Sequence, residues 1–322
     1  MKAVQILGDI SSPRIVTNDD MPTPSPSGSE ILIKVHAAGI TGDAVTWPEI
    51  YATPSRIPGH EISGTVAALG PDYLGPLAVN QEVFGMLSAD RGQGQAEYAI
   101  CSAAEIAPMP SSISHAEAAV LPIPLLTAWE TIVDHGKITP STKVLLTGAS
   151  GAVGSVFVQL VSLLTGAHTI ALASAQNHEA LRKHGAENVV DYKAAGWEKS
   201  IGKFDVVFDT VGGDILTKTW DAVADDGIVV TVGDPPPAWA FGRGKAVEAE
   251  TRPGVRYMHF IVSPDAERLA EASSFIHSGR MKPLAVQSFG FGDAVEGWTY
   301  AQQRNRGKKA VIVFDVYNCK RD

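Results

Sequence analysis

Short apolar segments, each bounded by glycine, proline or polar residues, dominate the first 125 residues of the chain. Three of them have the composition of strands, at residues 31–37, 62–67 and 96–100. The first follows a Pro-Ser-Pro-Ser-Gly segment at 24–28, which is typical of a turn. Many short strands separated by turn residues are characteristic of all-β barrels and sandwiches. The pattern therefore predicts a compact, barrel-like β unit.

From about residue 143 onward, apolar runs with strand spacing alternate with runs that have helical spacing. The expected strands are 143–147, 168–173, 188–190, 204–209 and 227–232, and the expected helices are 152–164, 179–184 and 216–224. Strands that alternate with helices form right-handed βαβ units, which build a parallel sheet covered by helices. The sequence therefore predicts an α/β fold with a doubly wound parallel sheet in this part of the chain.

The last part of the chain changes pattern again. Residues 264–279 have helical spacing, and 286–289 and 310–316 have the composition of strands. We expect this tail to return to the β unit, which divides the chain into segments 1–125, 126–260 and 261–322. Between the sheet and the tail, three consecutive prolines begin an irregular stretch, 235–256, that is a candidate mobile loop.

Length, composition and charge limit the classes of function. The chain has 322 residues, 45% hydrophobic and 19% charged, with a formal net charge of −9 from 26 basic and 35 acidic residues. This length suits two domains, and this composition suits a soluble globular protein. A net negative field repels phosphates, so we expect neither nucleic acid nor a membrane as a partner. A local pocket for one phosphate stays possible.

Cysteine content and apolar runs bear on the compartment. The two cysteines, Cys101 and Cys319, make neither a disulfide framework nor a four-cysteine zinc site. The first residues do not have the pattern of a signal peptide, and the longest strongly apolar stretch, 156–164, is too short to span a bilayer. We expect a soluble cytoplasmic protein.

The strongest local motif lies between the expected strand 143–147 and the expected helix 152–164. It reads Gly148-Ala149-Ser150-Gly151-Ala152-Val153-Gly154, and its last six residues fit the dinucleotide-binding pattern with Ala149 in place of the first glycine. Gly151 would allow close approach of a pyrophosphate, and Gly154 would allow tight helix packing. The helix N-terminus would offer N–H groups to the anion. An ordinary glycine-rich turn is the competing interpretation, which the strand and helix on either side disfavour.

The end of the second strand of this unit bears on the choice between NAD and NADP. An NAD site usually has an acidic residue there, whereas this strand continues into residues 173–178 without one, and the first acid is Glu179. The absence of a carboxylate favours NADPH. Ser174 would donate to the 2′-phosphate, and His178, Arg182 or Lys183 would supply charge. For Arg182 and Lys183, a solvated helix face is the simpler interpretation.

Several segments in a fixed order carry a resemblance to a known family. They are residues 37–43, Gly59-His60-Glu61 within 58–64, residues 94–98, Leu121-Pro122 with 126–129, the glycine-rich loop, 185–192, 204–213 and 307–312. With these segments the chain resembles the medium-chain dehydrogenase/reductase superfamily over nearly its whole length, and it is most similar to the zinc-free quinone oxidoreductase branch.

The resemblance implies a GroES-like β-barrel catalytic domain built from both ends of the chain, with a Rossmann-type domain inserted and the active site in the cleft. It also implies hydride transfer from NADPH and a homodimer. Residue by residue, it implies contacts of Ser174 and Tyr192 with the 2′-phosphate, of Thr41 and Thr127 near the nicotinamide, and of Val211, Val232 and Gly233 along the cofactor. Asn177 departs from the family, because it stands where a phosphate-binding lysine is common.

The segment Gly59-His60-Glu61 resembles the zinc-ligand motif of alcohol dehydrogenases. Catalytic zinc normally needs three Cys, His or carboxylate ligands. Thr41 stands where that family has a cysteine, and residues 122–125 contain no ligand type. We therefore expect no metal, and we interpret His60 and Glu61 as a hydrogen-bonded pair, with His60 a candidate for the substrate pocket.

Without a metal, a quinone, enone or other conjugated carbonyl is the expected small-molecule substrate, because it accepts hydride more readily than a simple ketone. Tyr51 is the candidate proton donor, although a packing tyrosine is an equal alternative, and Thr127 is the second catalytic candidate. Trp47, Trp239 and Phe241 form a candidate aromatic wall or else pack in the protein. Asp209 is interpreted as serving the fold, and the cluster of Arg304, Arg306, Lys308 and Lys309 as a solvated turn. Two other functions remain open: an NADPH-binding sensor or structural protein without turnover, and a zinc-type alcohol or ketone dehydrogenase.

Overall fold

The computed structural model describes residues 1–304 and 306–314. The chain divides into two compact units, one made of Met1–Leu126 with Ser263–Asp322 and the other of Thr127–Val262. The first boundary lies one residue from the expected one, and the second lies two residues away. The first boundary falls inside a helix, so no linker composition marks it.

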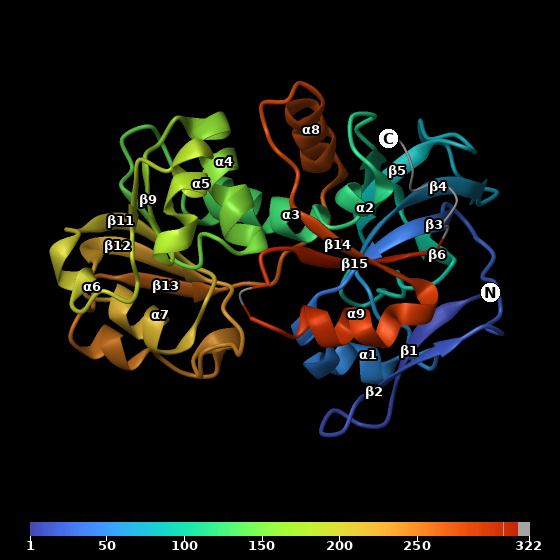
Figure 1. Ribbon diagram of the computed structural model, residues 1–322, viewed down its shortest axis with the longest axis horizontal. Helices are drawn as coiled ribbons and strands as arrows, with labels where there is room; N and C mark the ends of the chain where they lie inside the picture. The colour runs from blue at the N-terminus through green and yellow to red at the C-terminus, as the bar shows by residue number, and fades with distance from the viewer. Residues whose placement is uncertain (305, 315–322) are drawn as a thin grey trace. The chain divides into compact units, whose positions relative to one another are not determined.

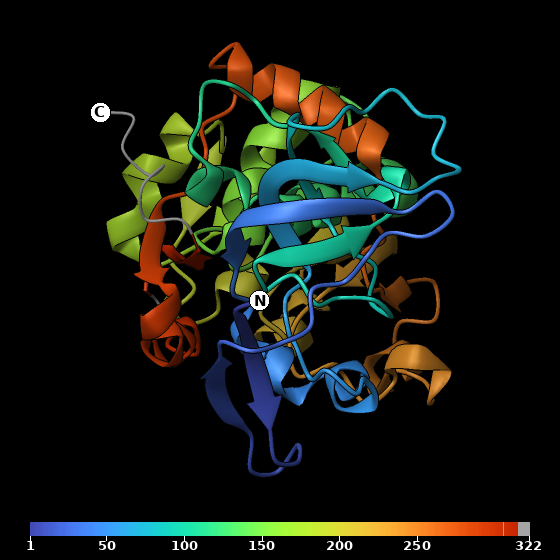
Figure 2. The same cartoon turned by 90° about the vertical axis from the view of Figure 1, so that its right-hand side faces the viewer.

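The first unit is built on a seven-stranded sheet, in which strands from the two ends of the chain are neighbours. The strand order is β14-β15-β3-β4-β5-β7, with β6 also paired to β3, and a separate hairpin, β1–β2, stands apart from this sheet (Figure 2). All pairs are antiparallel except β14–β15. The strands are β1 (Ala3–Leu7), β2 (Arg14–Asn18), β3 (Ile31–Gly39), β4 (Glu61–Leu69), β5 (Glu82–Met86), β6 (Tyr98–Cys101), β7 (Ile106–Pro108), β14 (Val286–Gly290) and β15 (Lys309–Val313). The helices are α1 (Pro48–Ala52), α2 (His115–Ala118), α8 (Ala266–His277) and α9 (Ala294–Ala301).

The apolar strand patterns are explained by two cores in this unit. Eight of the nine residues of β3 are buried, and several of them belong to the first of these cores. One core contains Ile31, Ile33 and Val66. The other contains Ile40, Trp298 and Ile312, and it joins the hairpin, α9 and β15. Burial along nearly the whole strand accounts for the mostly apolar composition that the sequence shows at 31–37, where Lys34 is the one half-buried position.

The second unit is a parallel sheet of six strands with the order β10-β9-β8-β11-β12-β13. Figure 1 shows the helices α4, α5 and α7 packed around it. The strands are β8 (Val144–Leu146), β9 (Thr169–Leu172), β10 (Asn188–Val190), β11 (Phe204–Asp209), β12 (Val223–Thr231) and β13 (Arg256–His259). The helices are α4 (Ala152–Thr165), α5 (His178–Lys183), α6 (Trp197–Ser200) and α7 (Gly213–Thr219), and α3 (Pro122–Glu130) enters the unit from the first. The chain winds outward from β8 in both directions, so the sheet has a topological switch point between β8 and β11.

The expected strands at 188–190 and 204–209 are confirmed, but the helix expected at 216–224 is wrong at both ends. Helix α7 begins at Gly213 and ends at Thr219, and residue 224 belongs to β12. The helix ends earlier than expected because the side-chain hydroxyl of Thr219 donates to the Leu216 carbonyl. The residues that follow, Trp220 and Ala222, are buried in a turn. Of the strand expected at 310–316, the described part ends at Val313, and residues 315 and 316 lie outside the described residues, as does Cys319.

The stretch at 235–256 is irregular, as expected, but its side chains anchor it to the second unit. Trp239 packs edge-on against Tyr257 at 5.0 Å between ring centroids, and Phe241 packs against His259 at 4.9 Å. The Arg252 guanidinium donates to the carbonyls of Trp220 and Val223. In the structure, Trp239 is partly buried and packs against the core cluster of this unit, while Phe241 is 53% exposed.

A helical run that the sequence analysis missed extends over His115–His135. Among the described residues it is the one helix long and apolar enough to cross a membrane, and 78% of its most apolar window is buried within the structure. A core helix of a soluble protein passes the same test of length and composition. The run combines α2, α3 and a π-helical turn, Thr131–His135.

Candidate functional site: a dinucleotide loop and its strand ends

The glycine-rich loop joins β8 to α4 at the carboxyl edge of the parallel sheet. Gly148 adopts a φ of +63°, and a Cβ there would meet the Thr210 side chain. A Cβ on Gly154 would lie 2.6 Å from the Cα of Ala149, so the first turn of α4 packs directly on the loop backbone. Ala149 is fully buried beneath the loop, and its N–H donates to the Leu172 carbonyl. These contacts match the role expected for Gly154.

The outer side of the loop is open. Ser150 and Gly151 are exposed, and a Cβ on Gly151 would meet only the Gly148 carbonyl oxygen, at 3.2 Å. The Ser155 N–H donates to the Gly151 carbonyl, so the N–H groups of Ala152, Val153 and Gly154 precede the first intrahelical donor. No acidic residue occupies the first turn of α4. Free N–H groups, a positive helix end and an open glycine backbone fit a pyrophosphate.

The next two strands bring Ser174 and Tyr192 to the same edge of the sheet. β9 and β10 are parallel neighbours with Leu172 opposite Val190, and each of the two residues follows its strand by two positions. Both side chains are half-buried. The Asn177 amide donates to the Ser174 hydroxyl at 3.1 Å, which leaves the hydroxyl hydrogen for another acceptor.

The basic side chains near this edge are arranged differently. A ring nitrogen of His178 lies 3.1 Å from the Ala173 carbonyl, so this side chain turns back to the strand end. Lys183 pairs with Glu179 at 2.6 Å on an exposed helix face, and Arg182 is exposed. The solvated-face interpretation of Arg182 and Lys183 agrees with this arrangement.

Val211, Val232 and Gly233 follow β11 and β12 at the same carboxyl edge. Beneath them, the fully buried carboxylate of Asp209 accepts hydrogen bonds from the hydroxyls of Thr147 and Thr231 and from the N–H groups of Val211 and Gly212. The interpretation of Asp209 as a residue that serves the fold agrees with this burial. Thr127, the first residue of this unit, is 4% exposed in α3, and its carbonyl accepts from the Thr131 hydroxyl.

Thr41 and Tyr51 belong to the first unit. Thr41 is half-buried and precedes a 3₁₀ turn, Gly42–Thr46. The Tyr51 hydroxyl donates to the Val45 carbonyl at 2.6 Å, and the Arg56 guanidinium lies 5.2 Å from its ring centroid. Burial raises the pKa of Tyr51 above its usual value. These contacts favour the packing alternative for Tyr51, and its role as a proton donor stays a prediction.

His60 and Glu61 do not form the hydrogen-bonded pair expected from sequence, because each has its own partner. His60 is 6% exposed, with a ring nitrogen 3.3 Å from the Ala89 carbonyl and its ring 5.2 Å from that of Trp47. Burial lowers the pKa of His60. Glu61 is fully buried and forms an ion pair with Lys309, whose ammonium also donates to the Val120 carbonyl at 3.2 Å. Burial raises the pKa of Glu61 and lowers that of Lys309, and the ion pair opposes both shifts.

Lys309 therefore does not belong to a solvated turn, which corrects its interpretation from sequence. In the sequence, the apolar run that follows Lys309 in β15 is the feature that indicates burial of this residue. Asp43 lies in the same unit and accepts a hydrogen bond from the Trp47 side chain, and burial raises the pKa of its carboxyl.

A zinc ion does not fit the donors at this position. Thr41 offers a neutral hydroxyl, His60 a ring held at the Ala89 carbonyl, and Glu61 a carboxylate already paired with Lys309. No group of three or more His, Cys, Asp or Glu side chains able to hold a metal occurs in the described part of the chain.

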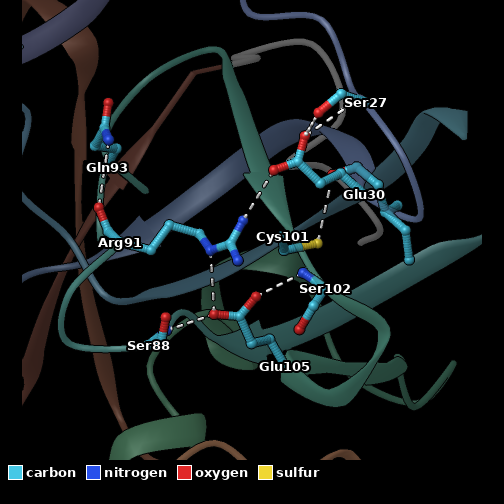
Figure 3. A network of polar contacts seen from close by, with 9 residues as sticks. Ser27, Glu30, Ser88, Arg91, Gln93, Cys101, Ser102 and Glu105 are labelled. Carbon is cyan, nitrogen blue, oxygen red and sulfur yellow. Dashed lines mark hydrogen bonds and ion pairs between the residues drawn. The ribbon is translucent and has the colours of Figure 1, made fainter. Parts of the chain in front are cut away.

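The loop that follows β5 contacts the His60 ring through the Ala89 carbonyl, and a buried carboxylate anchors this loop. Glu105 accepts from the N–H groups of Ser88 and Ser102, both at 2.6 Å. Figure 3 shows the Arg91 guanidinium between Glu105 and Glu30, at 3.6 Å from each. The Cys101 thiol lies nearby and donates to a backbone carbonyl, and burial raises its pKa, as expected for an unreactive structural cysteine.

Comparison with known proteins agrees with this architecture. Two family models match the chain: "Alcohol dehydrogenase GroES-like domain" over residues 27–111 and "Zinc-binding dehydrogenase" over residues 184–312. The 2-methylene-furan-3-one reductase of Solanum lycopersicum is 30% identical over 300 residues, with 88% of this chain and 71% of that protein covered. The chloroplastic NADPH-dependent alkenal/one oxidoreductase of Arabidopsis thaliana is 28% identical over 297 residues, with 88% and 72% covered.

The solved structures support the same fold. The quinone oxidoreductase from Coxiella burnetii aligns with a TM-score of 0.83 at 24% identity, covering 98% of this chain and 99% of that one. The fold expected from sequence is confirmed: a GroES-like unit combined with a Rossmann-type parallel sheet. The chain belongs to the medium-chain dehydrogenase/reductase superfamily of oxidoreductases, in its quinone oxidoreductase-like branch.

Proposed function

We propose that this protein is a zinc-independent, NADPH-dependent reductase that transfers hydride to a quinone, an enone or another conjugated carbonyl. The observation that carries the proposal is the open glycine-rich loop at the N-terminus of α4, together with a second strand, β9, that is followed by Ser174 rather than by an acid. The names of the two plant relatives, an NADPH-dependent alkenal/one oxidoreductase and a furanone reductase, support it.

Each predicted site residue of the second unit has a role that its position allows. The N–H groups of residues 152–154 bind the pyrophosphate over the exposed backbone of Gly151. The hydroxyls of Ser174 and Tyr192 hold the 2′-phosphate, and the backbone at Val211, Val232 and Gly233 aligns the nicotinamide. Thr41 and Thr127 are proposed to lie beside the nicotinamide. The cofactor, when bound, supplies the hydride, and the protein supplies position and electrostatics.

The choice of a conjugated substrate follows from the missing metal ligands. A simple ketone needs a Lewis acid at its oxygen, and the side chains around His60 do not make a three-ligand zinc site. A conjugated carbonyl spreads the developing charge itself, so water or a side chain such as Tyr51 suffices for protonation. Metal analysis of the purified protein tests this point, and stoichiometric zinc would favour the alcohol dehydrogenase alternative.

The experiment that tests the function combines a substrate panel with one substitution. Oxidation of NADPH is followed with quinones, enones and simple ketones, and turnover on the conjugated carbonyls alone is expected. In S174D, a carboxylate faces the 2′-phosphate, so KM for NADPH is expected to rise at least about tenfold while KM for NADH changes little, a difference worth about 1.4 kcal/mol. Tight NADPH binding without turnover across the panel would instead favour the sensor.

The cytoplasmic location is a proposal that rests on the sequence alone, and the homodimer is a proposal that rests on the family resemblance and on one feature of the parallel sheet. β13 is an edge strand of the parallel sheet and offers unpaired backbone groups to a second copy. Light scattering of the purified protein tests the dimer, and fractionation of the host cell tests the location.

A further inference from the structure

Three neighbouring strands of the second unit end on one buried carboxylate. Asp209 closes β11, between β8 and β12, and it has no exposed surface. One carboxylate oxygen accepts from the Thr147 hydroxyl at 2.6 Å, and the other accepts from the Thr231 hydroxyl at 2.7 Å. Both threonines are fully buried as well. A single side chain therefore joins the carboxyl ends of β8, β11 and β12.

The network extends from these side chains into the loops that follow the strands. The N–H groups of Val211 and Gly212 donate to the carboxylate at 3.3 and 2.9 Å. Each threonine hydroxyl also accepts a backbone N–H, from Thr210 at 3.2 Å on Thr147 and from Gly233 at 3.0 Å on Thr231. The loops after β11 and β12 are thus fixed by hydrogen bonds to Asp209 or to a hydroxyl that Asp209 orients.

These hydrogen bonds determine which way the peptide groups face. In a trans peptide, the carbonyl points opposite to the N–H of the next residue. The inward N–H groups of Gly212 and Gly233 therefore turn the carbonyls of Val211 and Val232 away from the carboxylate. The same network reaches the phosphate loop, because the Thr210 hydroxyl donates to the Thr147 carbonyl at 3.0 Å and is the nearest atom to a Cβ placed on Gly148.

We infer that Asp209 is a positioning residue for the nicotinamide cofactor, acting through Thr147, Thr231 and the backbone of residues 210–212 and 233. The inference rests on the proposed function, since it concerns the same cofactor. Asp209 has no surface with which to touch the cofactor, so its effect is transmitted by the loops that it holds. Loss of one hydroxyl leaves a buried N–H and one carboxylate oxygen short of a partner, which allows the peptide to rotate.

The test compares two threonines of equal burial in the same unit. T231V removes a hydroxyl from the network, whereas T219V removes a fully buried hydroxyl that donates only to the Leu216 carbonyl, at 2.6 Å. NADPH Kd is measured by fluorescence titration, and kcat and Tm are measured for the same samples. We expect T231V to raise Kd at least about tenfold, equivalent to about 1.4 kcal/mol. T219V lowers Tm and leaves Kd unchanged, and T231S restores tight binding.

T147V provides a second, independent removal of a hydroxyl in case T231V fails to fold, and the same rise in Kd is expected. Wild-type affinity for NADPH in T231V or in folded T147V would overturn the inference while leaving the proposed function intact. A wild-type protein that binds neither NADPH nor NADH would overturn the proposed function, and the inference with it. Equal losses of affinity in T231V and T219V would show that the network is only structural.

Discussion

Gly154 and Gly151 lie in the same loop, but alanine affects the protein differently at each. A Cβ on Gly154 would lie 2.6 Å from the Ala149 Cα and closer still to the Gly148 carbonyl oxygen, and both are backbone atoms that cannot rotate away. A Cβ on Gly151 would meet only the Gly148 oxygen, at 3.2 Å, and the φ of −74° at Gly151 suits any residue. G154A therefore pushes helix α4 off the loop, whereas G151A only adds a methyl group to the open outer side.

The magnitudes follow from these distances. Carbon atoms pack at about 3.5 Å, so G154A must move the helix or the loop by about 1 Å. Overpacking of this kind costs about 1–3 kcal/mol, and the better helix propensity of alanine returns about 1 kcal/mol. The difference is a net loss of up to about 2 kcal/mol. Because the clashing atoms belong to the backbone, we expect the upper value, which lowers Tm by about 4–8 °C. For G151A, the entropy lost from the unfolded chain and the poorer N-cap are of similar size, so stability stays within about 1 kcal/mol of wild type.

Thermal unfolding followed by circular dichroism and NADPH titration followed by fluorescence separate the two effects. Both variants are expected to bind NADPH at least about tenfold more weakly, equivalent to about 1.4 kcal/mol, but only G154A is expected to have a lower Tm than the wild type. Wild-type affinity in G151A would refute the assignment of the loop's outer side to the pyrophosphate. An unchanged Tm in G154A would refute the packing argument, whatever its affinity.

Three further outcomes are expected in the first unit, each measured by urea denaturation. K309M leaves the Glu61 carboxylate buried without its cation and lowers the free energy of unfolding by about 3–5 kcal/mol, and the double variant K309M/E61L recovers part of this loss. Because burial lowers the pKa of His60 below its ordinary value, the unfolded chain binds this proton first, so stability falls as the pH drops from about 7.5 to 5.5. H60Q reduces that slope, and an unchanged slope would contradict the cause given for the shift. E105A removes the acceptor of two N–H groups on half-buried residues, at about 1 kcal/mol or more each, whereas R91A, with a side chain 31% exposed, costs below about 1 kcal/mol. Equal losses in E105A and R91A would show that the ion pair, rather than the carboxylate's backbone contacts, holds the loop.

The second unit was predictable from sequence because its signals are local. Apolar runs between turn residues and helical segments predict the strands 188–190 and 204–209, and the central strand, 204–209, is buried along most of its length. The glycine spacing of the segment 148–154 predicts close backbone contacts inside this seven-residue segment. The structure shows such contacts at Gly154. The end of α7 was misplaced because a threonine hydroxyl and two buried side chains decide it, and helical spacing alone cannot show this.

The contacts of charged residues with distant partners were not predictable, although their positions in the sequence give a partial signal. Lys309 begins the apolar strand Lys309–Val313, and Asp209 ends the apolar strand Phe204–Asp209. A charge at the end of a buried strand needs a partner, because an unpaired buried charge costs several kcal/mol. The sequence thus indicates that each has one, but only the strand order, which places β15 beside β3 and β11 between β8 and β12, determines what lies nearby. Lys309 forms an ion pair with a buried carboxylate of the first unit, whereas Asp209 meets hydroxyl and N–H donors at three strand ends. A carboxylate bound in this way fixes backbone direction at the carboxyl edge of the sheet, where the cofactor is proposed to bind, and this difference is the physical reason to assign a positioning role to Asp209 and not to Lys309.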